Sequence, residues 1–156
     1  MDFIFMLTRN DETIADCLDV YASIREVPLG HIGFKDVGTD FDTLRRLHDR
    51  MKEDGLTTYL EVVSTDRESC LRSTEAGARL GVDCLMGGTL VDDILGLLKG
   101  TKTGYYPFPG VPVGHPTKLG GSPQKIAADT KSMIAAGCAG VDLLAYRATE
   151  ADPLEL

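Results

Sequence analysis

The chain has 156 residues, of which 43% are hydrophobic and 26% are charged, a balance typical of one globular domain with a sizeable core over residues 1–156. Its net charge of -8 argues against binding to duplex nucleic acid, which needs many Lys and Arg contacts to phosphates. No apolar run is long enough to span a membrane, and the first residues lack the basic and apolar pattern of a signal peptide. We therefore expect small metabolites as partners, with no nucleic acid and no membrane.

Four cysteines are spread along the chain without a Cys-x-x-Cys pair: Cys17, Cys70, Cys84 and Cys138. The three histidines are also dispersed, so the spacing of a zinc site is missing. We expect no metal and no other cofactor. Unpaired thiols of this kind are typical of a reducing compartment, and we expect a cytoplasmic protein.

Apolar strand-like runs alternate with amphipathic helical runs through the first hundred residues. In chain order we predict a strand over 3–8, a helix capped by Asn10 or Asp11, a strand over 31–37, a helix that ends at Gly55 and a strand over 58–63. After them come a helix that opens with the capping-box spacing of 65–68 and ends at Gly81, a strand over 82–86 and a helix over 90–99.

The pattern changes over residues 104–121, which contain five glycines and four prolines. Two short strands are predicted there, over 105–108 and 111–115. Ser122 and Pro123 form a good N-cap and first-turn pair for a helix that ends at Gly137. A last strand is predicted over 141–147.

A weak internal repeat joins the ends of two helices to the strands that follow. Residues 76–85 and 136–144 match closely, apart from one extra residue in the first. Repeated βα units form either a closed barrel or an open doubly wound sheet, and no Gly-x-Gly-x-x-Gly follows the first strand to favour the second. Because Asp83 and Asp142 stand where strands begin, we assign both to the side of the sheet that serves stability.

The Gly-Val-Asp-Leu-Leu run after an Ala-Gly helix end, within this βα array, resembles the phosphosugar-processing (ribulose-phosphate-binding) (β/α)8 barrels. The resemblance implies an α/β fold of the TIM-barrel type with its active site at the carboxyl ends of the strands. We count six or seven strands instead of eight. We therefore expect an incomplete barrel that lacks its C-terminal unit and whose open edges favour a homo-oligomer.

Two charged residues stand inside strands that otherwise look buried. Side chains alternate along a strand, so Ile32 and Phe34 share one face while Lys35 points to the other, and Glu61 has the same parity as Lys35 in its own strand. If helices cover the apolar faces, Lys35 and Glu61 meet in a shared interior. Buried charges are costly unless they are paired, so the two residues are either catalytic or a structural ion pair. Asp36 is interpreted as a solvated turn residue.

The segment rich in Gly and Pro contains a candidate anion site. Free N–H groups at a helix start attract a phosphate or carboxylate, and Lys118 lies shortly before such a start. Arg147 either grips the same anion or pairs with Glu150 or Asp152. His115 is either an acid/base group or a surface residue. The predicted substrate- or phosphate-binding residues are Lys118, Gly120, Gly121, Ser122 and Arg147.

Together these features predict an enzyme for a small anionic carbonyl compound, a phosphorylated sugar or a sugar acid. The reaction is carbon–carbon cleavage by an aldolase-like lyase, or proton transfer beside a carbonyl by an isomerase or epimerase. Lys35 activates the carbonyl, covalently or by its charge, Glu61 moves the proton, and His115 is the third catalytic candidate. The alternative is a non-catalytic, ligand-sensing or structural protein. An open nucleotide-binding sheet needs a phosphate loop after the first strand, which residues 8–11 do not supply.

Overall fold

The computed structural model describes residues 2–64 and 66–156, which fold into an α/β structure. Its strands are β1 (Ile4–Met6), β2 (Thr8–Arg9), β3 (Glu12–Thr13), β4 (His31–Lys35), β5 (Thr57–Val62), β6 (Cys84–Gly87), β7 (Gly104–Tyr106), β8 (Val111–Val113) and β9 (Lys118–Gly120). Its helices are α1 (Cys17–Ile24), α2 (Phe41–Glu53), α3 (Arg67–Leu80), α4 (Val91–Leu98) and α5 (Pro123–Ala136), with 3-10 turns η1 (Ala145–Arg147) and η2 (Pro153–Glu155). Within the described residues, no helix has the length and apolar character needed to cross a membrane.

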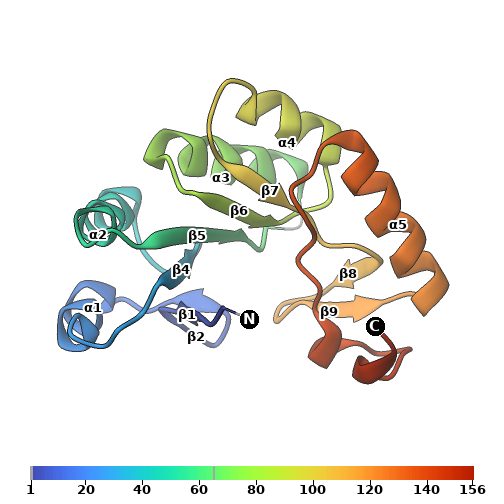
Figure 1. Ribbon diagram of the computed structural model, residues 1–156, viewed down its shortest axis with the longest axis horizontal. Coiled ribbons are helices and arrows are strands. Elements are labelled where there is room, and N and C mark those ends of the chain that lie inside the picture. Colours follow the sequence, from blue (N-terminus) through green and yellow to red (C-terminus); the bar gives the residue numbers. More distant parts are fainter. Residues whose placement is uncertain (1, 65) are drawn as a thin grey trace.

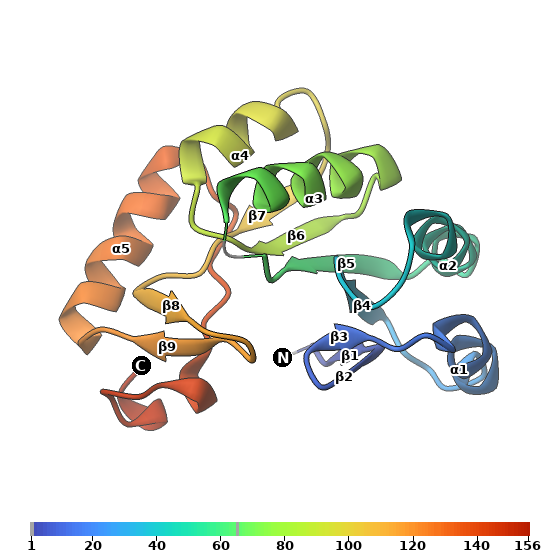
Figure 2. The same ribbon diagram turned by 180° about the vertical axis from the view of Figure 1, so that it is seen from behind.

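A parallel sheet of five strands, in the order β1-β4-β5-β6-β7, forms the centre of the molecule. Figures 1 and 2 show helices α1 to α4 along the outer side of this curved sheet. Two hairpins form small antiparallel sheets, β2 with β3 and β8 with β9. Strand β9 was not expected from the sequence, because it has only three residues and lies in the segment rich in Gly and Pro.

The predicted incomplete (β/α)8 barrel is wrong. The described residues form five parallel strands with β1 and β7 outermost, and not a series of eight βα units. Residues 139–142 run beside β7 through hydrogen bonds from Ala139 N to Tyr105 O and from Asp142 N to Pro107 O, both 2.9 Å, but they form no regular strand. The chain then turns into η1, so the strand predicted over 141–147 does not exist. Local βα repeats are shared by open and closed sheets, and only the pairing of distant strands distinguishes the two.

Helices α3 and α5 each begin after a residue whose side chain accepts a backbone N–H of the first turn. Ser122 Oγ accepts the N–H of Lys125 at the start of α5, as predicted. The predicted capping box begins at Thr65, which lies outside the described residues, and Asp66 provides the N-cap of α3. The cap predicted at Asn10 or Asp11 is wrong. Both residues have positive φ, 52° and 68°, and form the two-residue turn between β2 and β3.

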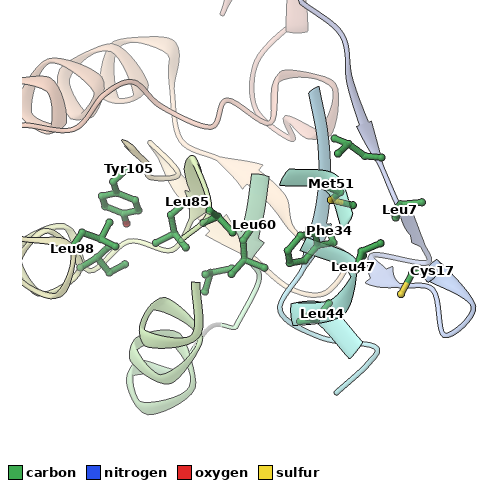
Figure 3. Close-up of a cluster of buried hydrophobic side chains, with 14 of the residues drawn as sticks. Leu7, Cys17, Phe34, Leu44, Leu47, Met51, Leu60, Leu85, Leu98 and Tyr105 are labelled. Atoms are coloured by element: carbon green, nitrogen blue, oxygen red, sulfur yellow. The ribbon is translucent and has the colours of Figure 1, made fainter. Parts of the chain in front are cut away.

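The core lies between the sheet and the helices. Ile32, Phe34, Leu60 and Leu85 point from β4, β5 and β6 toward the helices and are at most 1% exposed. Figure 3 shows these strands packed through Phe34, Leu60 and Leu85 against Leu44 and Leu47 of α2 and Leu98 of α4. The predicted alternation of the strands is therefore confirmed, and the opposite face of the same strands carries the polar residues.

His48 of α2 is a buried histidine without a hydrogen-bond partner on either ring nitrogen among the described residues. Burial lowers its pKa. Lys52 acts in the same direction, while Asp49 and Asp83 oppose the shift. Below about pH 6.5 the unfolded chain therefore binds a proton that the folded chain does not, and stability falls as the pH decreases.

Replacing His48 by leucine is expected to remove this acid sensitivity. Urea denaturation between pH 7.5 and 5.5 should show a smaller loss of stability for His48→Leu than for the wild type. The wild type should lose up to about 1.4 kcal/mol more per pH unit below the unfolded pKa. The partly exposed His31→Gln serves as the control, and parallel curves for wild type and His48→Leu would contradict the prediction.

Candidate functional site

Three charged side chains form a buried cluster at the carboxyl end of β4 and β5. Lys35 Nζ lies 2.6 Å from Asp11 Oδ1 and 2.9 Å from Glu61 Oε2. Lys35, Asp11 and Glu61 are only 4%, 7% and 8% exposed. Two carboxylates thus share one ammonium group away from solvent, where such pairs interact strongly and the loss of one partner is costly.

The fold fixes each member of this cluster through the backbone. Lys35 and Glu61 are directly opposite in the parallel register of β4 and β5. The hydroxyl of Thr13 accepts the N–H of Lys35 and donates to its carbonyl, both at 2.8 Å, which holds β3 at the end of β4. The tight turn between β2 and β3 then carries Asp11 to Lys35 Nζ.

Arg147 joins the cluster from the far end of the chain. Its Nη2 and Nη1 lie 3.1 and 3.2 Å from Asp11 Oδ1, and Nη1 also donates to Thr117 O at 3.3 Å. Burial opposes the ionisation of Asp11, but the hydrogen bonds from Lys35 and Arg147 outweigh it and lower the pKa of this carboxyl. His115 Nδ1 is 3.9 Å from Asp11 Oδ2, beyond hydrogen-bond distance. The alternative pairing of Arg147 with Glu150 or Asp152 is not formed.

Asp142 lies beside the carboxyl end of β7, where its backbone N–H donates to Pro107 O at 2.9 Å, so its assignment to the stability side of the sheet is wrong. Its side chain is partly buried beside β7, and burial together with the negative charge of Glu61 raises its pKa to about 7. The positive charges of Lys35 and Arg147 oppose this rise without overcoming it. Asp142 is thus a carboxyl group that gains and loses a proton near neutral pH, as an acid/base group must.

Asp83, the other aspartate of the repeat, has the structural role expected for it. Its Oδ2 accepts the backbone N–H and the hydroxyl of Thr58, both at 2.8 Å, and pairs with Lys52 Nζ at 2.8 Å. These contacts tie the start of β6 to the start of β5. The repeat therefore places one aspartate at the amino ends of the strands and the other near the charged cluster.

Asp36 is predicted to be a solvated turn residue, but both oxygens of its carboxylate accept hydrogen bonds from neighbouring residues. Its Oδ1 accepts the N–H of Val63 at 3.0 Å and its Oδ2 accepts the hydroxyl of Ser64 at 2.8 Å. Val63 and Ser64 line two neighbouring cavities of about 450 and 730 Å³ at the carboxyl ends of the strands. Both volumes are in the range of small-molecule sites. Asp36 therefore fixes the wall that these cavities share.

The predicted anion-binding residues are divided by the fold. Lys118 and Arg147 line one cavity of about 480 Å³, next to the charged cluster. Gly120 and Gly121 lie farther along the chain, at the end of β9 and before α5, and Ser122 uses its hydroxyl as the N-cap. The contacts of Ser122 serve the helix and do not connect it to the cluster.

His115 and Thr117 connect the cavities to the cluster. His115 lines the cavity of 730 Å³ and Thr117 lines the cavity of 450 Å³. The backbone N–H of Thr117 points at Asp11 Oδ2 over 3.5 Å. The tip of the β8–β9 hairpin therefore lies against the turn between β2 and β3, in agreement with the views of Figures 1 and 2.

Asp11 and Asp142 are the two members of the cluster that sequence reasoning missed. Asp11 looks like a helix cap, and only its neighbour Asn10, which tolerates positive φ, hints at a hairpin turn. In the part of the chain that the structure describes, no group of three or more His, Cys, Asp or Glu residues is arranged to hold a metal ion. The cluster offers cationic, anionic and proton-donating groups at one place.

Comparison with protein-family models gives no match for this chain, and comparison with curated proteins gives none either. The function is therefore inferred from the chemistry of the site.

Proposed function

We propose that this protein is an enzyme acting on a small anionic carbonyl compound, a phosphorylated sugar or a sugar acid. The reaction is proton transfer beside the carbonyl or cleavage of the adjacent carbon–carbon bond. The observation that carries the proposal is the buried cluster of Asp11, Lys35 and Glu61, which the exposed Arg147 joins from the surface, with Asp142, a carboxyl group of pKa about 7, beside it. Charged groups of both signs gathered near a cavity, with a carboxyl of raised pKa among them, are typical of active sites.

In this proposal Lys35 polarises the carbonyl by its charge. A Schiff base needs a neutral amine with a free lone pair, whereas Lys35 Nζ donates a hydrogen bond to Asp11 and forms an ion pair with Glu61. Glu61, held by the same ammonium, takes up the proton, and Asp142 supplies or receives one in the opposite direction. His115, at the rim of the larger cavity, is the third acid/base candidate.

The anionic group of the substrate is held by Lys118 and Arg147, which line the same cavity. Arg147 links this cavity to Asp11 and so to Lys35. The four cysteines are free and buried, which fits a reducing compartment such as the cytoplasm. The open edge at β1 supports self-association of this chain.

The test is exchange of carbon-bound hydrogen in D2O, followed by NMR over a panel of sugar phosphates and keto acids. We expect the wild type to exchange or cleave at least one of these compounds, and Glu61→Gln to be slower by about 100-fold or more. Glu68→Gln, at an exposed position of α3, is the matched control and should keep the wild-type rate. Equal rates for wild type and Glu61→Gln, or no turnover of any compound, would overturn the proposal.

A structural role for the cluster is the second candidate, favoured by the burial of Lys35, which is only 4% exposed. In that case Lys35 and its two carboxylates fasten β3, β4 and β5 together and bind no substrate. This role is distinguished from the catalytic one if replacing Lys35 lowers the stability of the protein while the wild type turns over none of the compounds tested.

A further inference from the structure

A cavity of about 480 Å³ lies between the β8–β9 hairpin and the segment formed by η1 and the residues after it, and it shares only Thr117 with the cavities at the strand ends. Lys118 lines it from β9, and Tyr146, Arg147 and Thr149 line it from the C-terminal segment. The parallel bridge between Leu119 and Ala148 joins these two walls. The volume suits a metabolite of moderate size.

The charges of this cavity differ from those of the other cavities. Its lining contains two cations and no carboxylate, in a chain of net charge -8. The cavity of 730 Å³ contains Glu12 and Asp66, and the single cation of the 450 Å³ cavity, Arg67, is already paired with Asp93. Of the two cations, Arg147 is paired with Asp11, whereas Lys118 forms no ion pair among the described residues, so its ammonium group remains free for an anion.

Tyr146 is the second unusual feature. Its side chain is 92% exposed, although large aromatic groups are normally covered. The backbone beneath it is held by hydrogen bonds from Arg147 N to Leu144 O and from Thr149 N to Leu119 O, both 2.9 Å. The ring is therefore presented from a fixed turn at the edge of a cationic cavity.

We propose that this cavity binds a ring-shaped sugar phosphate, with the phosphate on Lys118 and Arg147 and the sugar ring against Tyr146. The inference rests on the anion role given to Lys118 and Arg147 in the proposed function, but it requires binding only and no turnover. An aromatic ring packs well against the C–H face of a pyranose, while two cations suit phosphate oxygens. Tyr146 would then select cyclic over acyclic phosphates.

The test is calorimetric titration with glucose 6-phosphate, glycerol 3-phosphate and inorganic phosphate. We expect the wild type to bind glucose 6-phosphate more tightly than glycerol 3-phosphate, and Tyr146→Ala to lose about 5-fold for the cyclic ligand alone. Lys118→Met should weaken all three. Phe3→Ala, which removes another exposed aromatic ring, is the control and should bind like the wild type.

No binding of glucose 6-phosphate to the wild type, or the same affinity for Tyr146→Ala, would overturn the inference. Binding that depends on Tyr146 without any hydrogen exchange or cleavage would support this site and count against the proposed chemistry alone. Exchange that depends on Glu61 while Tyr146→Ala has no effect would leave the proposed function and remove this site. Circular dichroism of each variant checks that it is folded.

Discussion

Replacing Lys35 by methionine is expected to lower the free energy of unfolding by about 3 to 5 kcal/mol. The reason is that Asp11 and Glu61 stay buried, at 7% and 8% exposure, after the ammonium between them is removed. Arg147 still reaches Asp11, but Glu61 keeps no cation within the distance of an ion pair among the described residues. Urea denaturation at pH 7.5, with the wild type measured alongside, gives the difference.

Lys52→Met is the matched control, because Lys52 forms a partly exposed ion pair with Asp83. It should cost less than about 1 kcal/mol, as exposed pairs do. The triple variant Lys35→Met, Asp11→Asn, Glu61→Gln removes all three charges and should recover most of the lost stability. If Lys35→Met is as stable as Lys52→Met and turnover is abolished, Lys35 is a working residue and not a structural one, since active-site residues are often replaced without loss of stability.

Replacing Asp142 by asparagine is expected to stabilise the protein at pH 8. The folded pKa of Asp142, about 7, is far above the ordinary value of 3.8. Between pH 4 and 7 the folded chain thus holds a proton that the unfolded chain has released, and the wild type loses stability as the pH rises through this range. Above pH 7 the loss is complete and amounts to at most about 4 kcal/mol.

The gain of Asp142→Asn over the wild type should therefore shrink as the pH falls from 8 to 4, which denaturation at several pH values will show. Asp83→Asn is the control from the same sequence repeat. The pKa of Asp83 is lowered, because its bonds with Lys52 and Thr58 outweigh burial, so its removal should destabilise the protein at neutral pH. If both variants stabilised the protein at pH 8, or both destabilised it, the two aspartates would not have the different environments described.

The sequence predicted the parts of this site that depend on alternation along single strands. The parity of Lys35 and Glu61 follows from the apolar residues beside them, and the parallel register then places their side chains 2.9 Å apart. The burial of the other face also follows from this alternation, and Ile32 and Phe34 are fully buried against the helices. A strand imposes this alternation whatever the rest of the fold does.

Other predictions were wrong where the local sequence is compatible with two different structures. Asn10 and Asp11 suit a helix cap and a tight hairpin turn equally well, and the contact with Lys35 holds them in the turn. The run 141–147 looks like a strand, but its backbone contacts with β7 end at Asp142 and the chain turns into η1. The same local pattern therefore gives different structures, depending on which neighbour it meets.

By itself the sequence determined the α/β class, the end of α3 at Gly81, the caps of α5 and the faces of the central strands, because these depend on residues a few positions apart. Tertiary structure decided that the sheet is open, that Asp11 and Arg147 lie on one cluster and that Asp142 faces Glu61 and Asp83 does not. Asp11 and Arg147 are 136 residues apart, and no local pattern encodes their meeting. Their contact forms only when the two hairpins and η1 pack together over the carboxyl ends of β4 and β5.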